Sequence, residues 1–199
     1  VGMIVNMLFM TTTTGISSLV EDRTTDFTQE MMISPVSRYS IIIGKILGSS
    51  FGAIIGMFGT IIVGLCMGIT LTPAQLLLII ILSPLICLSA GALATIIIGV
   101  IKNNRTANIA VSLITMPQMF LSGAIIPIGN SHGILYIISR MMPMTYCLDL
   151  VRSFVYAGTP QYNSVVLNNP VIDLAVIIVL TFVCLVIGTF FYARSEKNR

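Results

Sequence analysis

The sequence predicts an all-α integral membrane protein, and three observations carry this prediction. Hydrophobic residues make up 56% of the 199-residue chain and charged residues 9%, against roughly 25% charged residues in an average soluble domain. Mean hydropathy is +1.01. The apolar residues form roughly five runs of about 20 residues, the length at which a helix crosses a bilayer. These runs fill residues 1–199 as one membrane domain, which leaves no room for a soluble catalytic domain.

The first expected span covers residues 1–20. It is apolar but contains Asn6 and four threonines at positions 11–14, so we expect it to face other helices or a cavity rather than lipid. The charged segment, Glu21 to Lys45, follows and is the one long polar stretch in the chain. Val1 already lies within an apolar run, which is expected if the natural N-terminus is missing.

Four further spans are expected in apolar runs separated by short polar breaks, at residues 46–71, 74–101, 107–122 and 171–193. In the second span a small residue recurs every four positions from Gly44 to Gly68, a ridge that lets another helix backbone approach closely. Pro84 in the third span removes a backbone hydrogen bond and is expected to kink its helix. Pro117 interrupts the fourth span.

Between the fourth and fifth spans, the sequence is neither a clean span nor a soluble domain. Two apolar pieces, at 134–138 and 148–156, are too short to cross a bilayer and are punctuated by charged residues and prolines. Pieces of this length are typical of re-entrant or interfacial helices. We therefore expect a re-entrant helical hairpin here, in which Asp149 and Arg152 are spaced to pair on one helix face.

The basic residues predict the orientation of these spans. Eight of the ten Lys and Arg residues fall on one side if the charged segment, the break at 102–105 and the C-terminal tail lie together. By the positive-inside rule this side is the cytoplasm, which makes the C-terminus cytoplasmic and the hairpin an outer one. The net charge of +3 comes from span ends rather than from a basic patch, so nucleic acid is excluded as a partner.

Two common active-site motifs are absent from the sequence. It contains no G-x-x-x-x-G-K-[ST] phosphate loop and no H-E-x-x-H. The four cysteines are single and the one histidine is His132. We therefore expect no catalytic residue, no metal site and no cofactor bound by this chain. Proton- or sodium-coupled carriers place ionisable residues near mid-membrane, whereas the charges here lie at span ends, so energy for transport is expected from outside the chain.

The charged segment itself predicts a short cytoplasmic helix. Asp26 is placed to cap the amides that follow it, with Gln29 in a capping-box arrangement. Phe27 and Met31 are four residues apart and share one face, and Pro35 stops or redirects the chain. Because the segment is rich in acidic residues, docking into a groove of another protein is favoured over lying on anionic lipid.

Two stretches of the sequence resemble type 2 ABC exporter permeases, the family that includes daunorubicin-resistance and polysaccharide-export membrane subunits. The first resembles the cytoplasmic coupling segment of that family and contains Glu21, Asp22, Arg23, Phe27, Glu30, Met31, Pro35, Arg38 and Gly44-Lys45. The second resembles the motif between the last two spans and contains Leu121-Ser122-Gly123, Pro127, Pro143, Thr145-Tyr146, Asp149 and Arg152. Related sequences often carry glycine where this chain has Asp26, and both residues suit a helix N-cap.

The resemblance implies a permease without an ATPase of its own, in a bacterial or archaeal cytoplasmic membrane. Family members have six spans, so this chain would lack the N-terminal helix and the first span. Two permeases would pair as a homodimer or heterodimer and dock onto two cytoplasmic ABC ATPase subunits, which bind ATP and Mg²⁺. The implied contacts with the ATPase are Glu21, Asp22, Arg23, Phe27, Glu30, Met31, Pro35 and Arg38.

The same resemblance implies where cargo passes. The second and fifth family spans line a central cavity, which makes Asn6, Thr13, Met116, Gln118 and Phe120 the candidate lining residues, with ordinary helix packing as the other interpretation. The outer hairpin, with Gly123, Pro127, Pro143, Tyr146, Asp149 and Arg152, would cap the exit. Drug export (multidrug efflux), lipid, polysaccharide and peptide export all remain open, as do import, a secondary carrier or channel, and a membrane scaffold that recruits a cytosolic protein.

Overall fold

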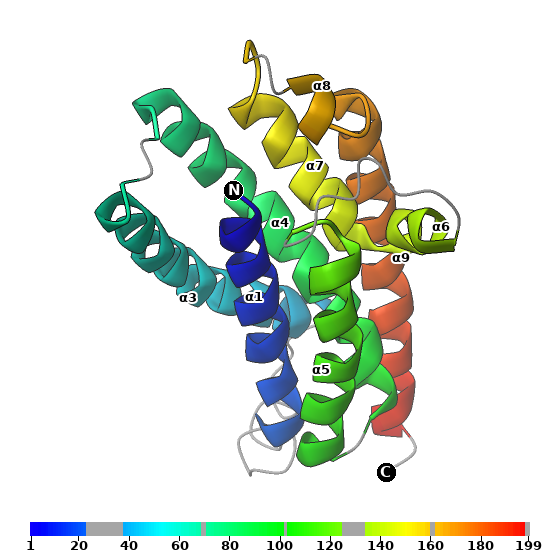
Figure 1. Cartoon of the computed structure of the whole chain (residues 1–199). Helices are drawn as coiled ribbons and strands as arrows, with labels where there is room; N and C mark the ends of the chain where they lie inside the picture. Colours follow the sequence, from blue (N-terminus) through cyan, green and yellow to red (C-terminus); the bar gives the residue numbers. More distant parts are fainter. Residues whose placement is uncertain (23–37, 69–70, 102, 125–133, 160–161, 198–199) are drawn as a thin grey trace.

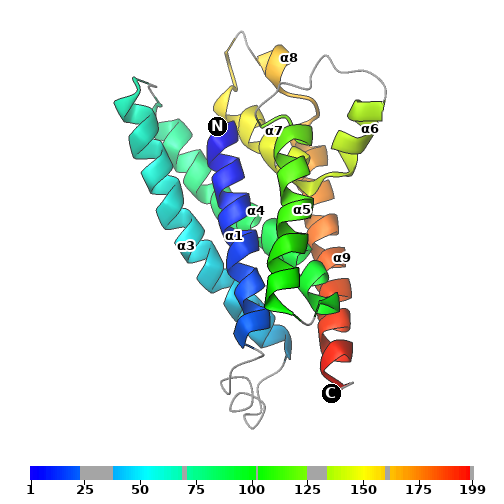
Figure 2. The ribbon, with the colours of Figure 1, turned by 60° about the horizontal axis from the view of Figure 1, so that its bottom comes forward.

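In the computed structural model every element of the described residues is an α-helix. The description covers residues 1–22, 38–68, 71–101, 103–124, 134–159 and 162–197. Five long helices run alongside one another (Figures 1 and 2): α1 (Gly2–Asp22), α3 (Arg38–Cys66), α4 (Pro73–Val100), α5 (Asn104–Leu121) and α9 (Pro170–Lys197). Helix α4 packs against α1, α3, α5, α7 and α9 and is therefore the central element.

Four of the helices are long and apolar enough to cross a membrane, which confirms the prediction of an all-α integral membrane protein. They cover Gly2–Val20, Ser40–Cys66, Pro73–Val100 and Pro170–Phe191. The fifth expected span is a helix, α5, but it does not reach the same hydropathy because Asn104, Arg105, Asn108 and Gln118 lie among its 18 residues. The described residues thus contain four candidate spans, with α5 lying beside them.

The helix ends that adjoin the Lys- and Arg-containing segments lie at one end of the bundle. The end of α1, the start of α3, the connection from α4 to α5 and the end of α9 all lie there (lower part of Figure 2). The start of α1, the connection from α3 to α4 and the helices α6 to α8 lie at the opposite end. We call these the basic end and the hairpin end. The count of Lys and Arg residues predicts this arrangement, in which the helix ends next to the charged segment, the break at 102–105 and the C-terminal tail lie on the same side.

Local signals account for where the helices begin. Thr72 caps α4 in a capping box: its hydroxyl accepts the Gln75 N–H, and the Gln75 side chain accepts the Thr72 N–H. The Gln75 amide also donates to the carbonyl of Val155 at 2.9 Å, which fixes the start of α4 to the end of α7. Both internal prolines, Pro84 and Pro117, are accommodated, since α4 and α5 continue through them.

The glycine ridge of α3 does not pack as the sequence predicts. A Cβ added at Gly44, Gly48, Gly52 or Gly64 would meet nothing within 4 Å. The buried face of α3 contains Ala53 and larger side chains, among them Ile42, Ile46, Met57 and Ile61. Close helix approach occurs elsewhere, at Gly188 of α9, where an added Cβ would lie 2.9 Å from the backbone nitrogen of Ile96.

The hairpin region forms three short helices: α6 (Ile134–Met141), α7 (Pro143–Val155) and α8 (Tyr162–Val165). At 1.5 Å per residue, the 13 residues of α7 extend about 20 Å, too short for a bilayer core of about 30 Å. Helix α7 packs against α1, α4 and α9, and most of its residues are buried. Helix α6 lies at the edge of the bundle (Figure 2), with Ile137 and Met141 exposed.

Candidate functional site

The charged segment is described only at its two ends. Its residues 23–37, including Asp26 and the predicted contacts Arg23, Phe27, Glu30, Met31 and Pro35, lie outside the described residues. Glu21 and Asp22 belong to the last turn of α1, and Arg38 opens α3. The segment therefore leaves from α1 and enters α3 at the basic end of the bundle (Figure 2).

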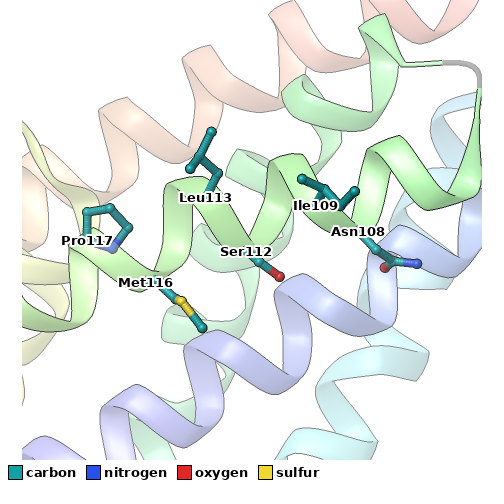
Figure 3. A pocket seen from close by; sticks show the side chains of 6 residues that line it. All are labelled: Asn108, Ile109, Ser112, Leu113, Met116 and Pro117. Atoms are coloured by element: carbon teal, nitrogen blue, oxygen red, sulfur yellow. The ribbon is translucent and has the colours of Figure 1, made fainter.

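An open groove of about 490 Å³ lies along α5, and part of its lining faces α1. It is lined by Asn108, Ile109, Ser112, Leu113, Met116 and Pro117. In Figure 3 the side chains of Asn108, Ser112 and Met116 point toward α1. These three residues are four apart and so share one helix face, a spacing from which Asn108 and Ser112 could have been predicted. The lining is apolar except for these two polar side chains.

The groove is tied to α1 near the basic end. The Ser17 hydroxyl of α1 hydrogen-bonds the side-chain oxygen of Asn108 at 2.5 Å. Ser17 is buried, and its hydroxyl also lies 2.7 Å from the carbonyl oxygen of Thr14. One polar contact therefore joins the first helix to the wall of the groove.

The five predicted cavity residues divide into two groups. Met116 and Phe120 are more than half exposed on α5, and Met116 lines the groove. Thr13 and Gln118 are buried and Asn6 is half-buried. The Thr13 hydroxyl donates to the Phe9 carbonyl at 2.6 Å, a bond within its own helix.

Two polar atoms of this inner group have no hydrogen-bond partner among the described residues: Asn6 Nδ2 and Gln118 Oε1. Leaving a buried donor or acceptor unpaired costs about 1–3 kcal/mol. One atom is a donor and the other an acceptor.

At the hairpin end, Asp149 holds α7 to the chain that leads into α9. Its side chain is 1% exposed. One carboxylate oxygen accepts the backbone N–H of Leu167 at 2.8 Å and the other that of Asn168 at 2.7 Å.

Asn168 extends this contact to α6 and α9. Its side-chain amide donates to Asp173 at 2.9 Å, and its side-chain carbonyl accepts a hydrogen bond from Arg140. Arg140 also donates to the Tyr136 hydroxyl at 2.7 Å and lies over that ring. We call Arg140, Asp149, Asn168 and Asp173 the hairpin cluster. Asn168 and Asp173 were not among the predicted site residues, although an Asn-Asn-Pro sequence before an acidic first turn is a recognisable helix start.

The remaining predicted hairpin residues hold the turn between α5 and α7. Arg152 donates to the carbonyl of Gly123 at 2.7 Å, and Gly123 has a φ of 83°, which glycine adopts without penalty. The Tyr146 hydroxyl donates to the Arg140 carbonyl at 2.7 Å. Pro143 occupies the first turn of α7, where its missing N–H costs nothing. Pro127 lies outside the described residues.

The expected hydrogen-bonded pair of Asp149 and Arg152 is replaced by other partners. Asp149 binds the amides of Leu167 and Asn168, and Arg152 binds the Gly123 carbonyl. Burial lowers the pKa of the Arg152 guanidinium, and the nearby charge of Asp149 acts in the opposite direction. The two residues thus fasten α7 at two separate points.

Comparison with known proteins agrees with these features. A sequence model of the ABC-2 type transporter family matches residues 1–156, which include both stretches quoted above. The chain is also similar to a protein of Cyanophora paradoxa named "Putative transport permease ycf38", with 26% identity over 141 residues. That match covers 70% of this chain and 48% of the relative. The chain therefore spans about half the length of this curated relative.

Proposed function

Because the chain belongs to the ABC-2 type transporter family, we propose that it is the membrane-spanning permease subunit of an ATP-driven exporter. In this proposal a separate cytoplasmic ATPase subunit binds ATP and Mg²⁺, and two permeases pair in the cell membrane with their C-termini in the cytoplasm. The chain itself carries no catalytic residue. Its part is to convert movement of the ATPase into movement of helices.

The observation that carries the proposal is the connectivity at the basic end. Residues 23–37 join α1 directly to α3, so a partner that pulls on this segment acts on both helices. Helix α1 packs in turn against α3, α4, α5 and α7. Because part of the groove lining on α5 faces α1 and Ser17 bonds Asn108, a displacement of α1 changes the wall of the groove. The charged segment and the groove are thus mechanically linked.

The charges in the spans support an external energy source. The four candidate spans contain two charged residues, Lys45 and Asp173, each within two turns of the start of its span. An ion-coupled carrier needs ionisable residues along the path of its ion. The middle parts of these four spans offer none, so ATP hydrolysis by a partner is the favoured source.

The groove favours a drug-like or lipid-like cargo. Its lining is apolar except for Asn108 and Ser112, and apolar pockets with a few polar groups bind molecules of that character. A polysaccharide, with hydroxyl groups along its whole length, would leave most of them unpaired in such a groove.

Affinity capture of the full-length protein from its native membrane tests the coupling. We expect a subunit with a Walker-type phosphate loop to be retained, and Phe27→Ala with Glu30→Ala to abolish its retention. Phe182→Ala on the exposed face of α9 is the matched control and should retain the subunit. If the wild type retains no ATPase, or if the double variant retains it fully, the coupling role is wrong.

The same preparation separates the other two functions. A secondary carrier or channel would move cargo in vesicles under an ion gradient without ATP. A scaffold would retain a cytosolic protein that lacks the phosphate loop and would move no cargo. An exporter requires both a retained ATPase and ATP-dependent movement.

A further inference from the structure

Helix α6 has one face fixed to the protein and leaves the opposite face uncovered. Ser139 is 1% exposed, and its carbonyl accepts the hydroxyl of Thr145 in α7 at 2.6 Å. Ile137 and Met141 are 63% and 74% exposed. Each of them is two residues from Ser139, which places it about 160° around the helix from that serine. Two large apolar side chains therefore lie opposite the face that α7 holds.

Arg140 of the hairpin cluster fixes the level of α6 along the bundle. Its guanidinium donates to the side chain of Asn168, two residues before Pro170, where the last candidate span begins. It also donates to the Tyr136 hydroxyl at 2.7 Å. Arginine and tyrosine suit the membrane–water interface, where the polar tip meets the headgroups and the rest of the side chain lies against lipid. The contact with Asn168 thus places α6 at the hairpin-end surface of the bilayer.

Apolar side chains are exposed at this level on α9 as well. Val171 and Ile172, in its first turn, are 71% and 55% exposed. Figures 1 and 2 both show α6 at the edge of the bundle. The uncovered face of α6 therefore continues the apolar surface with which the spans meet lipid, and the positive charge of Arg140 complements the phosphates of the headgroups.

We propose that α6 anchors the hairpin in the lipid interface, with Ile137 and Met141 among the acyl chains and Arg140 and Tyr136 among the phospholipid headgroups. A helix with one apolar and one polar side binds at that depth. Because Arg140 bonds Asn168, and the Tyr146 hydroxyl donates to the Arg140 carbonyl at 2.7 Å, the anchor joins the lipid surface to α9 and α7. The lipid interface thereby holds the hairpin in position, whatever cargo or energy source the protein uses.

A second copy of the chain is the other occupant that such a face would suit. Helix α6 has eight residues, and Ile137 and Met141 together offer far less area than the roughly 800 Å² per partner that a stable protein interface buries. Insertion into lipid needs only the apolar face itself. The size of the face therefore favours phospholipid.

The fluorescence of a single tryptophan tests the anchor. The 199-residue sequence contains no tryptophan, so Ile137→Trp provides one reporter once any tryptophan elsewhere in the full-length protein is replaced by phenylalanine. Ala157→Trp is the matched control. Ala157 is exposed and follows Val155, whose carbonyl bonds Gln75 in the first turn of a candidate span, so it lies beyond the end of that span.

Both variants are reconstituted in vesicles of phosphatidylcholine and phosphatidylglycerol. Bromine atoms on the acyl chains, close to the headgroup, quench tryptophan within the lipid, and acrylamide quenches tryptophan in water. We expect brominated lipid to remove most of the Ile137→Trp emission and acrylamide to remove little of it. For Ala157→Trp we expect the reverse, with emission at a longer wavelength.

Two results would overturn the proposal. Strong quenching of Ile137→Trp by acrylamide would place the face in water, and protection from both quenchers would place it against another protein chain. Met141→Trp lies on the same face and must give the same result as Ile137→Trp. It also decides alone if Ile137→Trp does not fold.

Discussion

The carboxylate of Asp149 accepts the backbone N–H of Asn168 at 2.7 Å and so fixes helix α7 to the chain that enters α9. Asp149 also bonds Leu167 at 2.8 Å, which leaves neither oxygen free for Arg152. The short helix of the hairpin and the last candidate span are therefore one mechanical unit. Any movement of α9 is transmitted to the hairpin end through this contact.

The substitution Asp149→Asn tests that unit. An asparagine has one acceptor oxygen in place of two, and its side-chain NH2 group would face one of the two backbone N–H donors. One buried N–H is then left unpaired, and we expect a loss of stability of about 1–3 kcal/mol. Thermal unfolding in detergent measures it, with Ser112→Ala on the exposed face of α5 as the control. An unchanged unfolding temperature for Asp149→Asn would mean that the two amide bonds do not hold α7 in place.

The turn before the hairpin gives a second prediction. Gly123 has a φ of 83° and its carbonyl accepts a bond from Arg152. An alanine in this left-handed conformation costs about 1–2 kcal/mol, and Arg152→Ala removes the partner of that carbonyl. Gly123→Ala and Arg152→Ala both destabilise the turn at Gly123. A double-mutant cycle should therefore show that their effects on stability are not additive. Strict additivity would indicate that the two residues act independently.

Two glycines should respond to alanine in opposite directions. At Gly188 a Cβ would lie 2.9 Å from the backbone nitrogen of Ile96, and two packed helices have no flexible side chain there to give way. We expect Gly188→Ala to destabilise by about 1–3 kcal/mol. At Gly52 nothing lies within 4 Å, so alanine should be neutral or stabilise by up to about 1 kcal/mol through its helix propensity.

The Gly52 variant also reports on assembly. If Gly52→Ala leaves the purified chain stable but reduces recovery of the full complex, another helix packs on the open ridge of α3. Equal recovery would mean that the ridge faces lipid. Comparing the yield of complex with the unfolding temperature of the chain separates the two effects.

Filling the groove gives a prediction about cargo. Ser112→Trp places a bulky side chain between α5 and α1, where Figure 3 shows the serine pointing. We expect ATP-dependent movement of cargo to fall while unfolding temperature and ATPase retention stay unchanged. Phe182→Trp, on the exposed face of α9, should transport normally. Normal transport by Ser112→Trp would mean that cargo does not pass through this groove.

Composition and spacing predict the architecture well because a bilayer constrains helix length and polarity so strongly. Apolar runs and their basic breaks are enough to place the four candidate spans and the common end of the breaks. Helix α5 falls short of a candidate span because Arg105 and Gln118 lower its hydropathy. The hairpin is predictable as a set of short helices for the same reason, since its apolar pieces are too short to cross.

Side-chain partners are less predictable, because they depend on contacts between distant parts of the chain. Spacing on one helix suggests Asp149 with Arg152, but Asp149 bonds amides 18 and 19 residues away. The period of four in α3 suggests a packing ridge, but the burial of Ile46 and Met57 turns that ridge outward. From the sequence, Asp173 is predicted only as an acidic residue in the first turn of a helix. Its hydrogen bond with Asn168 appears only in the structure.

The most direct test of the central claim is the ATP hydrolysis rate of the full-length permease reconstituted in proteoliposomes with its captured ATPase. The account predicts that added cargo raises this rate with the wild-type permease and has no effect with Phe27→Ala and Glu30→Ala. An equal rise with the double variant would contradict the claim that residues 21–45 receive the force of the ATPase.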